Sequence, residues 1–431
     1  MKQVRTRTNR RRSCELVTLA AVALLAAMGC QGSTPKTLTF SGSAVGQEAE
    51  VIRRQLDRFR TAHPSLQVEL RATPDAADQR HQLYVQWLNA RASEPDVLQL
   101  DVVWTPEFAA AGWIASLDKF RPRVDQFFQA AVAANRWNGS VYALPWFVDV
   151  GMLYWRTDLM PRPPRDLDEL GRFAAQARTQ GAVPFGLVWQ GARYEGLVTV
   201  FVEYLGAFGG TILDDRGQVA VDSDAAERAL TAMRDAIHVT GIVPAAALTW
   251  QEEQTRFAFQ TGQAAFMRNW PYAYAILQDR SQSSVAGHFA ATAMPAGPNG
   301  RSTAALGGSA LAINAFSDQV DEAYQLIEFL LQPEQMIERA RIAGQFPPRP
   351  ALYDAAALAD ALLMPAADAL HVIQQAVPRP VTPVYSQLSE LLQIGLHRAL
   401  TRQQEPRTAL RDAAASMRAL LARVKLGPAA P

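Results

Sequence analysis

The chain has 431 residues, of which 49% are hydrophobic and 19% are charged. This length predicts two or three domains, and this composition excludes a disordered chain. The 42 Lys and Arg residues nearly balance the 41 Asp and Glu residues, which argues against a nucleic-acid partner because such a partner needs a concentrated positive face.

The first thirty residues have the layout of a secretory signal. Basic residues precede the apolar stretch Leu16–Met28, which is followed by Gly29-Cys30. This stretch is short for a bilayer span, which needs about 20 residues. Because residues 25–30 resemble a bacterial lipobox, we expect a signal peptide at 1–29, a lipidated Cys30 and a linker at 30–36. An ordinary signal and a twin-arginine signal at Arg11-Arg12 are the alternatives.

The chain contains two cysteines, Cys14 and Cys30. Both lie in this N-terminal segment, so the rest of the chain can form neither a disulfide nor a thiolate metal site.

Strand and helix patterns alternate from residue 37 onward. The first predicted elements are a strand at Thr37–Phe40, a helix at Gln47–Ala62, a strand at Leu66–Ala72, a helix at Ala76–Arg91 and a strand at Val97–Trp104. This order predicts a parallel sheet covered by helices, where ligands bind beyond the carboxyl ends of the strands. The loop at 41–46 and Asp101 should therefore share one edge of the sheet.

Turn signals and further elements follow. Asn138-Gly139 predicts a hairpin. The later elements are a strand at Val150–Trp155, helices at Leu167–Thr179 and Ala192–Phe208, two short strands within Thr211–Val221, helices at Ala225–His238 and Glu252–Gln260, strands at Ala264–Asn269 and Ser309–Ala315, a helix from Ser317 to about Leu331, and C-terminal helices at Gln387–Thr401 and Pro406–Val424.

This interleaving predicts an α/β fold of two lobes, each a sheet covered by helices, with a ligand cleft between them. We expect lobe 1 to contain residues 37–145 and about 270–316. Lobe 2 should contain residues 146–269 and about 317–431, including the C-terminal helices.

Several side chains are of the types that bind a sugar, which offers apolar C–H faces and a rim of hydroxyls. Asn269-Trp270-Pro271-Tyr272 presents two aromatic rings, although these could equally be core residues. Asp101 and Asp149 lie in apolar contexts, where a carboxylate needs a partner or a cleft. Glu252 is a helix first-turn acid that could also contact a ligand, while Glu203 is expected to be solvated. Arg379 is held between prolines.

Signals of catalysis are weak. No HExxH, G-x-S-x-G or Walker pattern occurs in the sequence, and no cofactor or metal is expected. A secreted glycoside hydrolase that uses paired carboxylates from Asp101, Asp149 or Glu252 is the alternative function.

Four stretches of the sequence resemble a known family: residues 100–104 with 112–114, residues 144–154, residues 194–197 and residues 259–272. They are similar to the extracellular solute-binding lipoproteins of bacterial ABC sugar importers, and within these to trehalose/maltose-binding proteins. The resemblance covers nearly the whole mature chain. Leu306-Gly307-Gly308 and residues 379–383 agree with it.

The resemblance implies a two-lobe periplasmic-binding-protein-like fold of class II. It also implies a non-enzymatic monomer, exported and anchored by lipid, that binds a disaccharide and delivers it to permease subunits. By this resemblance, Asp101, Asp149 and Arg379 would bind hydroxyls while Trp270 and Tyr272 stack on the rings. The remaining implied contacts are Glu252, Gly307, Gly308, Gln47, Glu48, Gln82 and Phe147, the last standing where some relatives have tyrosine.

Overall fold

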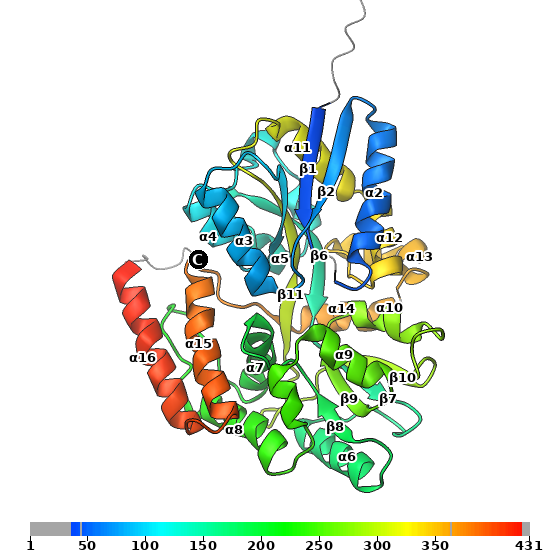
Figure 1. Ribbon diagram of the computed structural model, residues 1–431, viewed down its shortest axis with the longest axis vertical. Helices are drawn as coiled ribbons and strands as arrows, with labels where there is room; N and C mark the ends of the chain where they lie inside the picture. The colour runs from blue at the N-terminus through cyan, green and yellow to red at the C-terminus, as the bar shows by residue number, and fades with distance from the viewer. Residues whose placement is uncertain (1–35, 44, 363, 425–431) are drawn as a thin grey trace, which may run out of the picture.

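The computed structural model describes residues 36–43, 45–362 and 364–424. The predicted signal peptide and Cys30 lie outside these residues. Two lobes are stacked along the long axis of the molecule, and each is built around its own sheet (Figure 1). The predicted two-lobe α/β fold is confirmed.

Lobe 1 is built around a six-stranded sheet in the order β12-β11-β3-β1-β2, with β6 also paired to β11. The three N-terminal strands are parallel, as the alternating pattern predicts, and β11 runs antiparallel to β3 and β6. The strands are β1 (Lys36–Gly42), β2 (Leu66–Ala72), β3 (Val97–Asp101), β6 (Ala143–Val150), β11 (Ala304–Ile313) and β12 (Ala376–Val377).

Helices cover this sheet because each has an apolar face of suitable period. In α2 (Glu48–Ala62), Val51, Ile52, Leu56 and Phe59 are buried while the charged residues between them face solvent. The other helices of lobe 1 are α3 (Ala77–Asn89), α4 (Thr105–Ala110), α5 (Gln129–Ala134), α11 (Val320–Leu330) and α12 (Pro333–Ala343), with short 3-10 turns at Asp118–Phe120 and Val124–Gln126.

The predicted hairpin at Asn138-Gly139 is present. It joins β4 (Arg136–Trp137) to β5 (Ser140–Val141), and both turn residues have positive φ, 48° and 84°.

Lobe 2 is built around a four-stranded sheet in the order β10-β7-β9-β8. Its strands are β7 (Met152–Arg156), β8 (Phe185–Val188), β9 (Ala264–Asn269) and β10 (Phe289–Ala293). Its helices are α6 (Leu167–Thr179), α7 (Glu195–Ala207), α8 (Asp224–His238), α9 (Glu252–Gln260), α10 (Tyr272–Gln278), α15 (Tyr385–Leu400) and α16 (Pro406–Val424), with a 3-10 turn at Ala245–Thr249.

Helix α7 lies in the core of lobe 2 and is buried on nearly every side. The expectation that Glu203 of this helix is solvated is wrong, because its side chain is buried and accepts hydrogen bonds from Arg268 Nε at 2.9 and 3.0 Å. A carboxylate can remain in such a core only when it is paired in this way.

The chain divides between the lobes differently from the expected boundaries. Residues 289–293 form β10, which pairs with β7 of lobe 2, so the chain returns to lobe 1 only at β11. The helices after β11, α11 and α12, pack against α2 of lobe 1 because only a short connection follows the strand. Two strands expected within Thr211–Val221 reduce to one bridge between Leu213 and Val219, because Asp214 Oδ1 accepts from two backbone N–H groups of the turn.

Within the described residues, three segments cross between the lobes: the β6–β7 junction at Gly151, the start of β11, and residues 378–383. Gly151 is required at its crossing, since a Cβ there would lie 1.8 Å from Glu203 Oε1. Helices α13 (Ala356–Ala359) and α14 (Ala366–Gln374) and the 3-10 turn Pro350–Asp354 flank the crossings, and α14 packs against β6 and β10.

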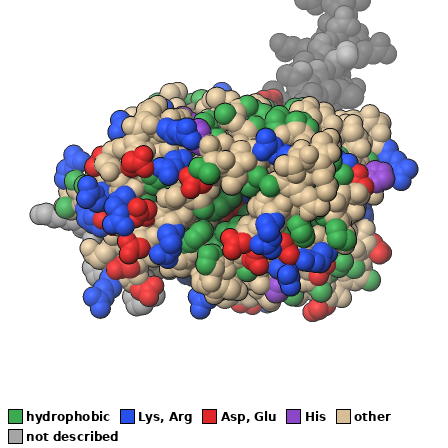
Figure 2. Space-filling view, turned by 90° about the horizontal axis from the view of Figure 1, so that it is seen from below, with side chains coloured by type: hydrophobic (Ala, Val, Ile, Leu, Met, Phe, Trp, Pro, Cys, Tyr) green, Lys and Arg blue, Asp and Glu red, His purple; other side chains and the backbone are tan. Residues whose placement is uncertain are grey.

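The lower end of lobe 2 displays acidic and basic side chains intermixed, without a large patch of one sign (Figure 2). Among the residues that the structure describes, no helix is both long and apolar enough to cross a membrane.

Candidate ligand-binding cleft

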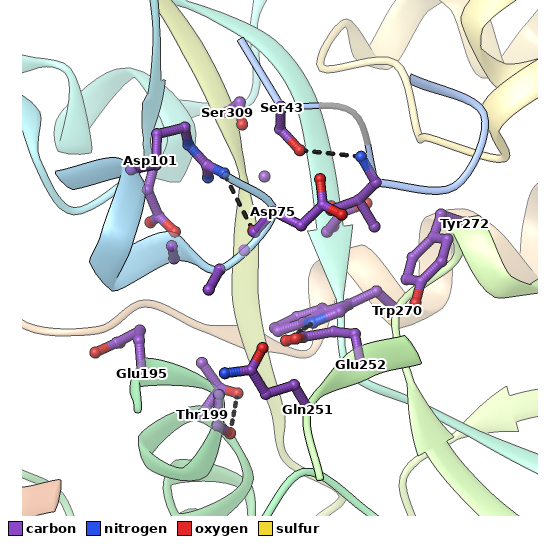
Figure 3. A pocket seen from close by; sticks show the side chains of 18 of the residues that line it. Ser43, Asp75, Asp101, Glu195, Thr199, Gln251, Glu252, Trp270, Tyr272 and Ser309 are labelled. Atoms are coloured by element: carbon purple, nitrogen blue, oxygen red, sulfur yellow. Dashed lines mark hydrogen bonds between the residues drawn. The ribbon is translucent and has the colours of Figure 1, made fainter. Parts of the chain in front are cut away.

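A cavity of about 290 Å³ lies between the lobes, close to the lower end of the range for small-molecule sites. Lobe 1 contributes Ser43, Asp101 and Ser309 from above, and lobe 2 contributes Glu195, Gln251, Glu252 and Trp270 from below (Figure 3). Ten of the twelve predicted ligand residues line it: Glu48, Asp101, Phe147, Asp149, Glu252, Trp270, Tyr272, Gly307, Gly308 and Arg379.

Trp270 lies along the floor of the cavity (Figure 3), directly after β9. The Arg268 guanidinium lies 4.0 Å from its ring centroid, and its Nε1 donates to Glu252 Oε1 at 3.4 Å. A Cβ at Gly307 would approach the ring to 3.0 Å, so any larger residue there would crowd the indole. The indole is therefore held flat by its neighbours and presents an apolar plate to the cleft.

Tyr272 begins α10 and is more buried than Trp270, with 5% of its surface exposed. Its Oη donates to Glu253 Oε1 at 2.7 Å. Tyr272 lines the cavity, but its hydroxyl already donates within the protein.

Arg379 joins carboxylates from both lobes at one side of the cleft. Its Nη2 donates to Asp101 Oδ1 at 2.9 Å and its Nη1 to Glu195 Oε1 at 2.6 Å, and the side chain is buried. Burial disfavours the charged guanidinium, but Asp101 and Glu195 outweigh it and raise the pKa of Arg379. Burial raises the pKa of Glu195. The guanidinium thus connects the third crossing to both walls of the site.

Asp149 lies near the end of β6 with its Oδ1 buried and without a hydrogen-bond partner in the part of the chain that the structure describes. Burial, together with the nearby carboxylates Glu48 and Asp101, raises the pKa of Asp149 to about 8. Such a group needs a partner that the described residues do not supply, and a ligand hydroxyl in the cleft would provide it.

The raised pKa of Asp149 predicts a pH-dependent stability. The unfolded chain releases this proton near pH 4, whereas the folded empty protein keeps it to about pH 8. The stabilisation is complete below about pH 4 and is lost as the pH rises toward 8. We expect the free energy of unfolding, measured with urea from pH 5 to 8, to decline less steeply in Asp149→Asn. Burial also raises the pKa of Glu195 and Glu203, so part of the decline should remain; equal slopes would contradict the assignment.

Two predicted residues lie outside this cavity. Gln47 is the residue before α2, and Gln82 of α3 lines a second cavity of about 420 Å³. The second cavity shares Ala76, Ala77, Tyr194, Glu195 and Gln251 with the first.

The sequence interpretation did not assign several lining residues to the site. Arg80 donates to the backbone of Pro74 and Asp75, and its guanidinium lies 5.2 Å from the Trp104 ring. A single arginine in an amphipathic helix carries no signal of this position. The others not assigned are Ser43, Val45, Asp75, Ala76, Ala77, Gln99, Tyr194, Glu195, Gly196, Thr199, Gln251, Glu253, Gln254, Ser309 and Gln345.

Comparisons with known proteins agree with this architecture. A model of the bacterial extracellular solute-binding protein family matches residues 46–337. A protein of Deinococcus radiodurans, described as a probable ABC transporter-binding protein, is 36% identical over 405 residues, which cover 90% of this chain and 94% of the relative.

Solved structures are similar as well. Maltose-bound MalE3 of Thermotoga maritima has 39% sequence identity and a TM-score of 0.85 over 89% of this chain and 100% of its own. A Thermotoga lettingae solute-binding protein bound with α-D-tagatose has 24% identity and a TM-score of 0.80 over 88% of this chain and 98% of its own, a likeness of fold.

Two lobes joined by three crossings around a polar cleft define a protein that binds a solute between its lobes. The chain belongs to the family of bacterial extracellular solute-binding proteins.

Proposed function

We propose that this protein is the sugar receptor of an ABC importer, which binds a disaccharide of the trehalose or maltose type and delivers it to permease subunits. The observation that carries the proposal is that the Trp270 plate lines the same cavity as Glu48 Oε2 and Asp149 Oδ1, two buried oxygens without a hydrogen-bond partner among the described residues. An aromatic face and fixed acceptors match the two surfaces of a pyranose ring. The likeness to a maltose-bound relative supports this assignment.

The charge of the cleft argues for a ligand that donates hydrogen bonds. The described lining includes seven carboxylates but two arginines, namely Glu48, Asp75, Asp101, Asp149, Glu195, Glu252 and Glu253 against Arg80 and Arg379. Asp149 is largely protonated at neutral pH because of its raised pKa, but the other acidic side chains still outnumber the two arginines. An anionic solute would be repelled by this excess of like charge, whereas the hydroxyls of a neutral sugar can donate to the remaining carboxylates.

The second cavity bears on the length of the ligand. Because it shares lining residues with the first, a third ring could extend from the Trp270 site toward Gln82. Maltotriose is therefore a useful probe beside the disaccharides.

Calorimetric titration of the purified protein with trehalose, maltose, maltotriose and glucose 6-phosphate tests the proposal. We expect saturable binding of at least one neutral disaccharide and none of the phosphorylated sugar. The sugars recovered afterwards should be intact, whereas released glucose would favour the glycoside hydrolase. Failure of all neutral sugars to bind would contradict a disaccharide receptor.

We also propose that the protein acts as a monomer and is exported and tethered by a lipid on Cys30. Cys30→Ser is expected to move the protein from the membrane pellet to the soluble exported fraction, because a single acylated cysteine provides the anchor. Fractionation of cells expressing each form, with Cys14→Ser as the matched control, measures this. Continued pelleting of Cys30→Ser would exclude Cys30 as the anchor.

A further inference from the structure

A buried arginine stands behind the lobe 1 wall of the cleft. Arg339, on α12, has 1% of its surface exposed, and its guanidinium lies 3.6 Å from the ring centroid of Trp146 in β6. It does not line the cavity. In the part of the chain that the structure describes, it forms no ion pair within 4.0 Å, in contrast to Arg268 behind Trp270. A buried cation placed in this way needs another source of compensation.

Arg339 is connected to the cleft through one side chain. Its Nη1 donates to Gln345 Oε1 at 2.7 Å, and Gln345 Nε2 donates to Glu48 Oε1. Gln345 and Glu48 are themselves 2% and 6% exposed. The other oxygen, Glu48 Oε2, is buried and has no partner in the described chain, and Glu48 lines the cavity.

The chemistry of the arginine fixes the direction of this chain of hydrogen bonds. A guanidinium can only donate, so the carbonyl oxygen of Gln345 must face Arg339 and its amide N–H must face Glu48. The carboxylate is thereby held as an acceptor on both oxygens. Its position at the first residue of α2 favours the same charge, because the helix dipole is positive there.

The backbone leaves Gln345 little freedom. Gly344 ends α12 with φ 69°, and a Cβ there would lie 2.9 Å from the Pro271 carbonyl oxygen. The next residue, Phe346, exchanges two backbone hydrogen bonds with Val148 of β6, at 2.8 and 3.3 Å. The side chain between these two anchors is therefore aimed by the main chain.

We infer that Arg339 and Gln345 are positioning residues that hold Glu48 as a hydrogen-bond acceptor for a ligand hydroxyl. The inference rests on the proposed function and assigns the lobe 1 end of the cleft a preference for a hydroxyl donor. Burial lowers the pKa of Arg339 to about 9, so the guanidinium is charged at neutral pH. Glu48 and Asp149 are among the acids that oppose this lowering.

A double-mutant cycle in sugar affinity tests the inference. We expect Glu48→Gln to weaken binding about tenfold or more, the scale of a hydrogen bond to a charged group. Arg339→Met should weaken binding roughly three- to tenfold in the wild-type background and hardly at all in the Glu48→Gln background. Arg339→Lys should retain most of the affinity, because it keeps a buried donor with positive charge.

Two further variants separate positioning from folding. Gln345→Leu removes the hydrogen bonds from Arg339 and to Glu48 while Arg339 remains. It should therefore weaken sugar binding in the wild-type background and hardly at all in the Glu48→Gln background. Arg341→Met, on the exposed face of the same helix, is the matched control and should bind as the wild type does. Unfolding curves without sugar show which variants are folded.

The outcomes distinguish a failure of the positioning role from a failure of the proposed function. The positioning role would be overturned if Arg339→Met and Gln345→Leu each weakened sugar binding as much in the Glu48→Gln background as in the wild-type background. It would also be overturned if Arg339→Lys bound sugar as weakly as Arg339→Met. In either case, sugar binding by the wild type would stand. Absence of sugar binding by the wild-type chain would overturn the proposed function and this inference together.

Discussion

Replacement of Arg379 by methionine is expected to destabilise the protein by about 3–5 kcal/mol, the cost of removing one partner from a buried charge pair. The loss would leave Asp101 and Glu195 facing one another without the cation that now bonds to both, at 2.9 and 2.6 Å. Urea denaturation at pH 7 measures the change in the free energy of unfolding. Sugar binding should be lost as well, because both carboxylates line the cleft.

Lower pH should reduce the cost of Arg379→Met. Burial already raises the pKa of Glu195, and removal of the guanidinium should raise it further, so a larger fraction of the carboxyl is protonated as the pH falls. The difference between variant and wild type should therefore be smaller at pH 5 than at pH 7. Arg418→Met, which breaks a largely exposed pair with Asp222, is the control and should hardly change stability. An effect as small as that of the control would show that Arg379 is not the centre of the interlobe cluster.

The N-terminal half of lobe 1 could be predicted from the sequence because its contacts are local. Each strand there is followed by its own covering helix, and the three strands join one parallel sheet in which β1 pairs with both β2 and β3. The strand predicted at Thr37–Phe40 is a few residues longer in the structure, where β1 spans Lys36–Gly42. The strand predicted at Val97–Trp104 is shorter and ends at Asp101.

The division between the lobes could not be predicted in the same way. β10 pairs with β7, more than 130 residues earlier in the chain, and no local pattern specifies such a partner. The expected strand at Val150–Trp155 is likewise interrupted at Gly151, where the chain passes from one sheet to the other. Glycine is required at this position because a side chain would collide with Glu203, which the packing of α7 brings close to it.

Residues of the candidate site could be predicted from the sequence where a charged residue lies among apolar neighbours. Asp101 and Asp149 are acids within apolar strands, and both line the cleft. The same signal was present for Glu203 within an apolar helix and for Arg268 within an apolar strand, and together they form a buried pair. Arg339 and Gln345 carry no such signal, because their role depends on α12 packing against α2 and β6.

Trp270→Ala is expected to weaken disaccharide binding by at least ~1 kcal/mol, about fivefold, because an aromatic contact contributes on this scale beyond its buried area. The structure gives the ring one role in the cleft, since Arg268 covers one face and Gly307 leaves room at its edge. Trp270→Phe should retain part of the affinity but lose the sugar-induced change in tryptophan fluorescence. Trp137→Ala, a half-buried tryptophan of the β4–β5 hairpin outside the cavity, is the matched control and should leave the affinity unchanged. Calorimetry on folded variants measures these differences. If folded Trp270→Ala bound sugar with full affinity, the ligand would have to lie elsewhere in the cleft, because the indole lies along the floor of this cavity.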